Sequence, residues 1–137
     1  MSIKKCKIIE LPLLNDDRGD LTFIENNKHI PFSIKRIYYL YNNHLNLIRG
    51  RHAHKNLHQL FIAISGSFDV FLNDGKEDTS FKLDKKNVGL YVPKMIWREL
   101  KNFSQDSVCL VLASDLYKED DYIRDYDKFL ISSELES

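Results

Sequence analysis

Short runs of residues that are apolar, or that alternate between apolar and polar, recur along the chain, roughly ten residues apart. They span residues 7–11, 21–25, 36–41, 57–65, 68–72, 79–83, 88–92 and 107–113. This rhythm is typical of antiparallel strands in a sandwich or a barrel. The segment Asn73-Asp74-Gly75-Lys76 places an Asp-Gly pair between two runs and predicts a hairpin, and Gly66 predicts a second tight connection. The pattern therefore predicts an all-β fold.

After Ala113 the spacing of apolar residues changes from strand-like to helical. Tyr122, Tyr126, Phe129 and Leu130 follow i, i+4, i+7, i+8 spacing, and charged residues occupy the other positions. Acidic residues at 119–121 suit the start of a helix, because they complement the positive end of its dipole. We predict one short C-terminal helix that packs on the sheet.

The chain length and the absence of a linker predict one domain. A chain of 137 residues can bury about two-thirds of its unfolded surface. No repeat, Pro/Ser-rich linker or low-complexity block interrupts the sequence. We predict a single domain over residues 1–137 with a core at about 7–130.

The charge balance argues against a general polyanion-binding surface. Twenty Lys and Arg balance twenty Asp and Glu, so neither nucleic acid nor a membrane is a predicted partner. Cys6 and Cys109 are the only cysteines, and Cys109 lies in an apolar run, so a disulfide framework is not expected. With no signal-peptide pattern and no long apolar segment, we predict a cytoplasmic protein.

Candidate chemistry is concentrated in the segment Arg49-Gly50-Arg51-His52-Ala53-His54-Lys55-Asn56-Leu57-His58. On a strand His52 and His54 point to the same face. The pair resembles the first cupin motif, but His58 stands at its glutamate position and Arg98 at the later histidine position. An arginine gives no lone pair to a metal and repels a cation, so we predict no metal. A three-nitrogen site of His52, His54 and His58 remains an alternative, as does a pair without function.

A closer resemblance is carried by several separated segments. They are Pro31-Phe32-Ser33-Ile34-Lys35-Arg36-Ile37-Tyr38-Tyr39, Arg49-Gly50-Arg51-His52-Ala53-His54-Lys55, Val88-Gly89-Leu90-Tyr91-Val92-Pro93, Trp97-Arg98-Glu99 and Val111-Leu112-Ala113-Ser114-Asp115. Together they resemble the bacterial dTDP-sugar 3,4-ketoisomerases over about residues 7–129. The resemblance implies a cupin, or jelly-roll, homodimer without cofactor or metal. It also implies isomerisation of dTDP-4-dehydro-6-deoxy-D-glucose to a dTDP-3-dehydro-6-deoxyhexose, which supplies 3-amino-3,6-dideoxy sugars for lipopolysaccharide, O-antigen or other surface polysaccharide.

The resemblance also implies roles for three catalytic residues. His52 matches the base that removes the C3 proton, His54 its proton-shuttling partner, and Tyr38 a tyrosine of the pocket. The chemistry agrees with these residue types, since a ketone at C4 acidifies the C3 hydrogen and histidine is a base near neutral pH. Which of the two histidines is the base stays open, because they share one face.

The predicted substrate-binding residues are Arg18, Arg49, Arg98, Trp97 and Glu99. Arg18 and Arg98 are candidates for stabilising the enediolate, since fixed cations lower the barrier where charge develops. Arg49, with Arg51 and Lys55, flanks the histidines and is a candidate for the diphosphate, although the last two occupy odd positions that can face solvent.

Two other functions remain as alternatives: a dTDP-sugar 3,5-epimerase, which removes a proton beside the same ketone, and a non-catalytic cupin that binds a sugar nucleotide. The gluco or galacto configuration of the product, the final sugar and the aromatic residue that stacks on thymine are left open. For the predicted homodimer we expect exchange of the N-terminal strand at residues 7–11.

Overall fold

The computed structural model describes residues 2–136, and nearly all of its regular structure is β-strand. The strands are β1 (Lys7–Glu10), β2 (Leu13–Asp16), β3 (Gly19–Thr22), β4 (Arg36–Leu40), β5 (Arg49–His54), β6 (Gln59–Ser65), β7 (Phe68–Asn73), β8 (Asp78–Leu83), β9 (Val88–Val92), β10 (Trp97–Lys101), β11 (Val108–Ala113) and β12 (Tyr122–Ile123). Two short 3₁₀ helices, η1 (Ile3–Lys5) and η2 (Glu119–Asp121), and one helix, α1 (Tyr126–Glu136), complete the described elements.

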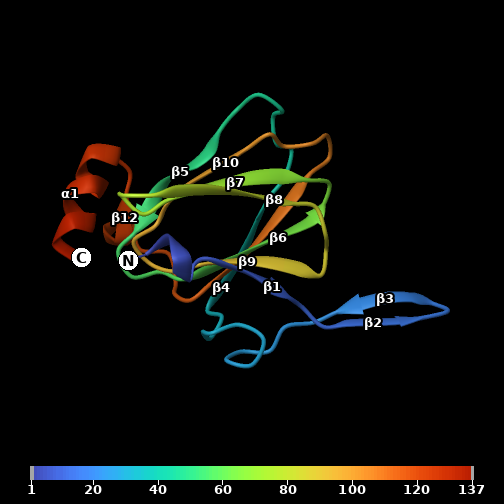
Figure 1. Ribbon diagram of the computed structural model, residues 1–137. Helices are drawn as coiled ribbons and strands as arrows, with labels where there is room; N and C mark the ends of the chain where they lie inside the picture. The colour runs from blue at the N-terminus through green and yellow to red at the C-terminus, as the bar shows by residue number, and fades with distance from the viewer. Residues whose placement is uncertain (1, 137) are drawn as a thin grey trace.

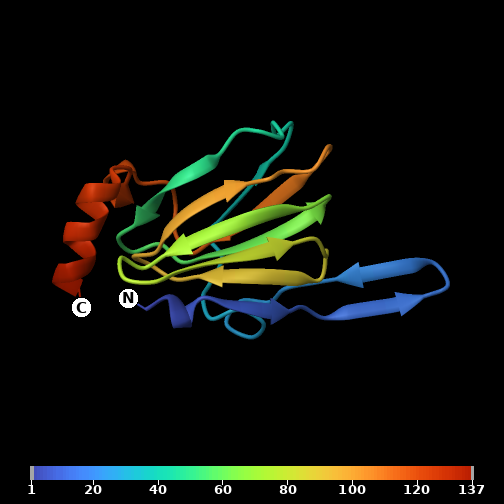
Figure 2. The ribbon, with the colours of Figure 1, turned by 45° about the horizontal axis from the view of Figure 1, so that its top comes forward.

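Ten strands form two antiparallel five-stranded sheets. One sheet has the order β1-β9-β6-β11-β4 and the other the order β12-β5-β10-β7-β8. The two sheets face each other across the molecule (Figures 1 and 2). This arrangement confirms the predicted all-β sandwich of the jelly-roll type with a short C-terminal helix.

The main core lies between the two sheets and follows from the alternation of side chains along each strand. In β7 the residues Phe68, Val70 and Leu72 are buried, whereas the residues between them are partly exposed. They pack in one cluster with Phe61 of β6 and Val111 of β11. Each strand thus contributes one apolar face to a shared interior.

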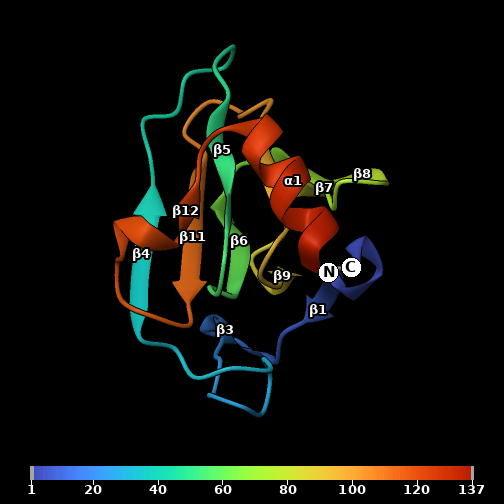
Figure 3. The same ribbon diagram turned by 90° about the vertical axis from the view of Figure 1, so that its left-hand side faces the viewer.

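The outer faces of the central strands are covered as well. Leu60 and Ile62, which alternate with the inward residues of β6, pack against Ile30 and Phe32 of the long connection between β3 and β4. The helix α1 lies beside the other sheet (Figure 3). Its residue Phe129 packs in one cluster with Trp97 of β10 and Ala53 of β5. The covering by the connection between β3 and β4 explains why strand β6 is apolar at nearly every position.

Both predicted turns are confirmed. The β7–β8 hairpin turns at residues 74–77, where Gly75 has a φ of +97° and the side chain of Asp74 accepts hydrogen bonds from the backbone N–H groups of Lys76 and Glu77. Gly66, with a φ of +65°, makes the tight connection between β6 and β7. In both turns glycine provides backbone conformations that other residues adopt with strain.

The C-terminal helix is present but begins later than the periodicity predicts. Residues 119–121 form η2, and Tyr122 and Ile123 form a strand that pairs with β5 before α1 starts at Tyr126. The helix-like spacing of Tyr122 relative to Tyr126 is therefore coincidental. Pairing with β5 overrides the local helical pattern and turns Tyr122 toward the interior.

The β2–β3 hairpin projects from the body of the sandwich (Figures 1 and 2), and its two strands pair only with each other. The preceding strand β1 pairs with β9 of the same chain, so the structure does not show the strand exchange predicted for residues 7–11. Within residues 2–136, the structure has no helix long and apolar enough to cross a membrane. Residues 1 and 137 of the predicted domain lie outside the described residues.

Candidate active site

Strand β5 carries the histidine pair on the inner face of the sandwich. Arg98 of β10 lies opposite His52, and Leu100 opposite Arg49, so two steps along β10 correspond to three along β5. This bulge contains Gly50, whose φ is +68° and whose missing Cβ leaves room for the side chain of Leu100. Bulges of this kind redirect neighbouring side chains and are frequent beside active sites.

The two histidines contact each other and a carboxylate. The Nε2 atoms of His52 and His54 are 3.1 Å apart, which confirms that both side chains point to one face. Nδ1 of His54 lies 2.9 Å from Oδ2 of Asp121. The ring of Tyr122 packs against both imidazoles, with centroid distances of 4.9 Å to His52 and 4.4 Å to His54. A strand, the end of a 3₁₀ helix and a two-residue strand therefore build this cluster.

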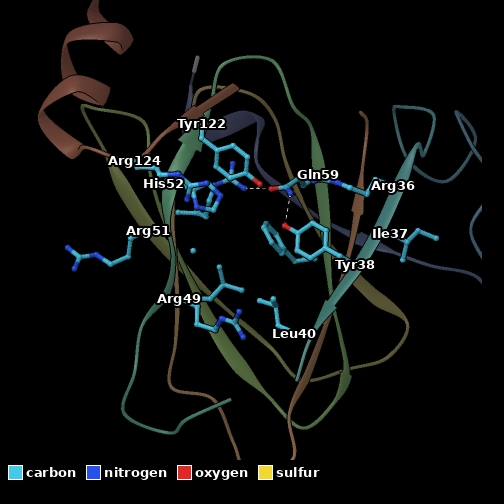
Figure 4. Close-up of a pocket in the computed structure, with 14 residues that line it drawn as sticks. Arg36, Ile37, Tyr38, Leu40, Arg49, Arg51, His52, Gln59, Tyr122 and Arg124 are labelled. Carbon is cyan, nitrogen blue, oxygen red and sulfur yellow. Dashed lines mark hydrogen bonds between the residues drawn. The ribbon is translucent and has the colours of Figure 1, made fainter. Parts of the chain in front are cut away.

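A second hydrogen-bonded chain crosses the interior beside the histidines. The buried guanidinium of Arg98 donates from Nη1 to the side-chain oxygen of Gln59, and Gln59 donates from Nε2 to the hydroxyl of Tyr38 at 2.8 Å. Arg98 also donates to the carbonyl oxygen of Ile96 from Nε and Nη2, at 3.3 Å and 3.2 Å. Figure 4 shows Gln59 and Tyr38 facing the cavity, and their strands, β6 and β4, are separated in the sheet by β11. These hydrogen bonds fix the orientation of the Arg98 guanidinium.

These residues line a cavity of about 460 Å³, a volume in the range that holds small organic ligands. Among the described residues that form its wall are five arginines and no Asp or Glu. The cavity therefore suits an anionic ligand. Its lining residues are Arg36, Ile37, Tyr38, Leu40, Arg49, Gly50, Arg51, His52, Gln59, Phe61, Arg98, Leu100, Tyr122 and Arg124.

Burial and the positive potential keep both imidazoles neutral. Burial, followed by the charge of Arg98, lowers the pKa of His52 from its ordinary value of 6.5 to about 3. The same two causes, in the same order, hold the pKa of His54 well below 6.5, while the Asp121 carboxylate at Nδ1 acts in the opposite direction. A neutral histidine has a free lone pair, so the pair is competent to accept a proton at neutral pH.

Arg98 and Tyr38 are also shifted by burial. Burial lowers the pKa of Arg98 from 12.5 to about 10, which leaves the guanidinium charged at neutral pH. Burial raises the pKa of the Tyr38 hydroxyl, so this group remains protonated. The cavity wall therefore combines a fixed cation, a neutral hydroxyl and two neutral imidazoles.

Some of the predicted residues line the cavity, and others lie elsewhere in the structure. His52, Tyr38, Arg49 and Arg98 line the cavity, and His54 lies directly behind His52 with 1% of its surface exposed. Arg49 lies toward the open side, where it donates to the side chain of Asn43 at 3.2 Å. The structure thus brings together all three predicted catalytic residues and two of the predicted arginines.

Trp97 and Glu99 are not brought into the cavity. They alternate with Arg98 along β10, so when Arg98 points inward both neighbours must point outward. Trp97 packs under α1 and donates through Nε1 to Glu99 at 3.0 Å, and Glu99 lies 3.7 Å from Arg51. Neither residue lines the cavity of the described chain, and their substrate contact stays a prediction. Arg51 forms part of the cavity wall, but its guanidinium points away from the centre of the cavity, as its odd position suggested (Figure 4).

Arg18 is also distant from the cavity of its own chain. It lies in the turn of the projecting β2–β3 hairpin, its side chain is 90% exposed, and its guanidinium contacts Asp16 at 2.6 Å. Arg18 therefore does not line the cavity of its own described chain, and its contact with substrate stays a prediction. A long exposed hairpin explains the difference, since it carries this arginine outward from the sandwich.

His58 does not join the histidine pair. It follows β5, outside the cavity wall, and its Nδ1 is 2.8 Å from the hydroxyl of Tyr91, with the two rings stacked. Within residues 2–136 no group of three His, Cys, Asp or Glu side chains has a geometry suited to a metal ion. The alternative site formed by His52, His54 and His58 is therefore not assembled.

Several site residues were missed from the sequence. Gln59, Tyr122 and Arg124 line the cavity, and Asp121 contacts His54 from behind. Gln59 lies in an apolar run, and a buried side-chain amide needs hydrogen-bond partners. The sequence alone could therefore have indicated that Gln59 belongs to a polar network. The helical spacing had assigned Asp121, Tyr122 and Arg124 to a helix. Their position became clear only because the strand formed by Tyr122 and Ile123 pairs with β5.

Arg36 is a further residue of the wall that sequence reasoning passed over. Its guanidinium lies 5.2 Å from the ring centroid of Tyr38 and 5.8 Å from that of Tyr117. Among the described residues, its Nε is the only buried side-chain nitrogen or oxygen without a hydrogen-bond partner. A buried donor of this kind calls for an acceptor, which a ligand in the cavity can supply.

Comparison with known proteins agrees with this site. The chain matches the protein family described as "FdtA: WxcM-like, C-terminal" over residues 4–134. It is 49% identical over 123 residues to TDP-4-oxo-6-deoxy-alpha-D-glucose-3,4-oxoisomerase from Aneurinibacillus thermoaerophilus, which covers 90% of this chain and 88% of that protein.

Solved structures show the same likeness. WlaRB, a TDP-quinovose 3,4-ketoisomerase from Campylobacter jejuni, is 52% identical, with a TM-score of 0.91 over 94% of this chain and 99% of that one. A His-to-Asn mutant of the 3,4-ketoisomerase QdtA from Thermoanaerobacterium thermosaccharolyticum, in complex with TDP-4-keto-6-deoxyglucose, is 37% identical. Its TM-score is 0.94, over 98% of this chain and 97% of that one.

A more distant structure shares the fold alone. The dTDP-4-dehydrorhamnose 3,5-epimerase of Bacillus anthracis has 20% identity and a TM-score of 0.77, over 89% of this chain and 79% of that one. This similarity supports the cupin-like architecture. It carries no information about the reaction of this chain.

Proposed function

This chain belongs to the dTDP-sugar 3,4-ketoisomerase family, and we propose that it isomerises TDP-4-keto-6-deoxyglucose to the 3-keto sugar through an enediol. The observation that carries the proposal is the neutral, hydrogen-bonded histidine pair in the wall of a cavity that also holds the buried cation of Arg98. A base without positive charge and a fixed cation are the two groups that enolisation of a ketone requires.

In the proposed reaction His52 removes the hydrogen bound to C3. The electron pair of that bond forms a C3=C4 double bond, and the negative charge develops on the oxygen at C4. Protonation of C4, loss of the proton from the C3 hydroxyl and gain of a proton by the C4 oxygen then give the 3-keto sugar. Atoms and electrons balance without an oxidant, since two protons have only changed position.

The neighbours of His52 supply the rest of the chemistry. Arg98, fixed by Gln59 and the carbonyl of Ile96, is suited to stabilise the oxygen on which charge develops. His54 exchanges a proton with His52 across their 3.1 Å contact, and the protonated hydroxyl of Tyr38 can donate to the sugar. Arg36, Arg49 and Arg124 of the cavity wall are the candidates for binding the diphosphate. The buried Nε of Arg36 has no hydrogen-bond partner and can donate to it.

The proposal is tested by incubating the protein with TDP-4-keto-6-deoxyglucose in D₂O and following the sugar by NMR. We expect the carbonyl to move from C4 to C3, and deuterium to enter at C4 to the extent that the transferred proton exchanges with solvent while it is held by the histidines. Inversion at C5 would instead identify a 3,5-epimerase. Binding of TDP without any exchange of the C3 hydrogen would identify a non-catalytic sugar-nucleotide-binding protein.

We also propose that the working form is a homodimer in which the β2–β3 hairpin of each subunit packs on the other. A two-stranded hairpin is at best marginally stable in water, yet this one has Leu14 and Leu21 opposite each other with 59% and 55% of their surface exposed. A partner surface would cover this pair, and Arg18 at the hairpin turn would then be available to the second subunit. Sedimentation should give a dimer, and Leu14→Asp should shift it toward monomer. A monomeric native protein at micromolar concentration would contradict the proposal.

Two further proposals concern the location of the protein in the cell and the pathway that uses its product. We propose a cytoplasmic location, because Cys6 and Cys109 are both buried free thiols, which suits a reducing compartment. Supply of 3-amino-3,6-dideoxy sugars for surface polysaccharide would follow if an aminotransferase acts on the 3-keto product. Detection of the aminated sugar in a coupled reaction would support this pathway.

A further inference from the structure

Asp121 holds His54 from the side opposite to His52. Its Oδ2 lies 2.9 Å from Nδ1 of His54, and its Oδ1 accepts the backbone N–H of Asn56 at 2.8 Å. The side chains of His54 and Asp121 are 1% and 13% exposed, so this contact is largely removed from water. A carboxylate only accepts hydrogen bonds, so Nδ1 of His54 must carry the hydrogen.

That hydrogen determines the protonation of the second histidine. A neutral His54 with a hydrogen on Nδ1 has a bare lone pair on Nε2. The Nε2 atoms of His54 and His52 are 3.1 Å apart, and one of them must donate. Because Nε2 of His54 accepts, Nε2 of His52 carries the hydrogen. The lone pair of His52 is therefore on Nδ1, and this is the histidine that lines the cavity.

We propose that Asp121 is a positioning residue that sets the tautomers of both histidines, and that it thereby makes Nδ1 of His52 the basic atom. The side chain of Asp121 is not among those that line the cavity and contacts His54, so its effect passes through His54. The inference rests on the proposed function, in which His52 removes the C3 proton.

The same contacts give the abstracted proton a path. When Nδ1 of His52 takes the proton from C3, the imidazole becomes a cation and can release its Nε2 hydrogen to Nε2 of His54. His54 then carries the charge beside the carboxylate of Asp121, which offsets the burial and the nearby cations that disfavour it. The neighbouring cations are Arg36, Arg98 and Arg124. The proton returns to the sugar by the reverse transfer.

Replacement of Asp121 by Asn changes this hydrogen-bond pattern while keeping its shape. The amide oxygen is needed by the N–H of Asn56, since an amide NH₂ there would bring two donors together. The NH₂ group therefore faces His54 and requires a lone pair on Nδ1. The hydrogen of His54 moves to Nε2, His52 becomes the acceptor there, and its own hydrogen moves to Nδ1. The base loses the free lone pair that it needs.

We expect Asp121→Asn to lower kcat by about 10²–10⁴-fold with KM and TDP binding nearly unchanged, the pattern of a base held in the wrong tautomer. In protein labelled with ¹⁵N at histidine, NMR should show the hydrogen on Nδ1 of His54 and Nε2 of His52. Both should exchange positions in Asp121→Asn. The matched control is Asp120→Asn, which removes the same charge from an exposed neighbouring residue. Its rate and tautomers should equal those of the native protein.

Asp121→Glu keeps the carboxylate and should restore the native tautomers and part of the rate, which separates the hydrogen-bond pattern from a general loss of folding. Native tautomers in Asp121→Asn, or a rate within about threefold of native, would overturn the proposal. The NMR measurement needs no substrate. Failure of the native protein to isomerise the 4-keto sugar would contradict the proposed function. The tautomer assignment would still be decided separately, by the ¹⁵N NMR spectra.

Discussion

Gln59 links the two halves of the cavity wall, and its replacement by leucine tests how strongly this polar network stabilises the protein. Gln59 and Arg98 each have 1% of their surface exposed. Leucine is similar in size but removes the acceptor of Arg98 and the donor to Tyr38. The guanidinium still contacts the carbonyl of Ile96, so Arg98 should stay in place with one N–H unsatisfied.

The expected loss follows from the two hydrogen bonds. A bond to a charged group contributes about 1.5–3 kcal/mol, and a neutral bond about 1 kcal/mol. Tyr38 faces the cavity, where water can replace its lost partner, so we expect a total near the middle, about 2–4 kcal/mol. For a chain of 137 residues the unfolding entropy is roughly 0.3 kcal/mol/K, so the midpoint of thermal unfolding should fall by about 10 °C.

The assay is thermal unfolding followed by circular dichroism or calorimetry at fixed protein concentration. Gln105→Leu is the matched control, since Gln105 is exposed in the connection before β11, and its midpoint should stay within about 2 °C of the native value. A drop for Gln59→Leu as small as that of the control would refute the reasoning. Gln59→Glu should largely retain stability, because a carboxylate accepts from both partners, but should weaken TDP binding by adding negative charge to the cavity.

Four further outcomes are expected. His52→Asn should lower kcat by about 10²–10⁴-fold while TDP binding, measured by calorimetry, stays nearly native, and a near-native rate would mean that another residue is the base. Burial holds the pKa of His52 at about 3 and that of His54 below 6.5, whereas the unfolded chain takes up protons below 6.5. The contribution of these two histidines to folding stability is thus complete above pH 6.5 and is lost as the pH falls toward 3, and urea unfolding at several pH values can measure this loss. For the same reason, a plot of kcat/KM against pH should show no decrease near pH 6.5. Activity should survive exhaustive chelation, and a loss restored by a divalent metal would remove the metal-free interpretation. Arg98→His should slow substrate consumption, because it removes the fixed cation, and should also change the gluco-to-galacto ratio of the products, trapped by a 3-aminotransferase and read by NMR.

Much of the architecture was contained in local sequence pattern. Alternation in runs such as 68–72 and 79–83 gives strands because each side chain points opposite to its neighbour. Asp74-Gly75 and Gly66 provide the backbone conformations of the two turns. The same alternation predicts that His52 and His54 share a face, and once Arg98 points inward it also directs Trp97 and Glu99 outward. These are properties of adjacent residues.

The completed site depended on contacts between distant parts of the chain. His54 and Asp121 are 67 residues apart, and Arg98 and Gln59 are 39 apart, so no local pattern relates them. Tyr122 fits a helical period, yet pairing with β5 makes it a strand residue, and its ring packs against both histidines. The sequence by itself determined which side chains point the same way along a strand, because that direction is set by backbone geometry within a few residues. Only the tertiary structure decided which of them meet, because burial of the two sheets against each other and pairing across the chain fix that choice.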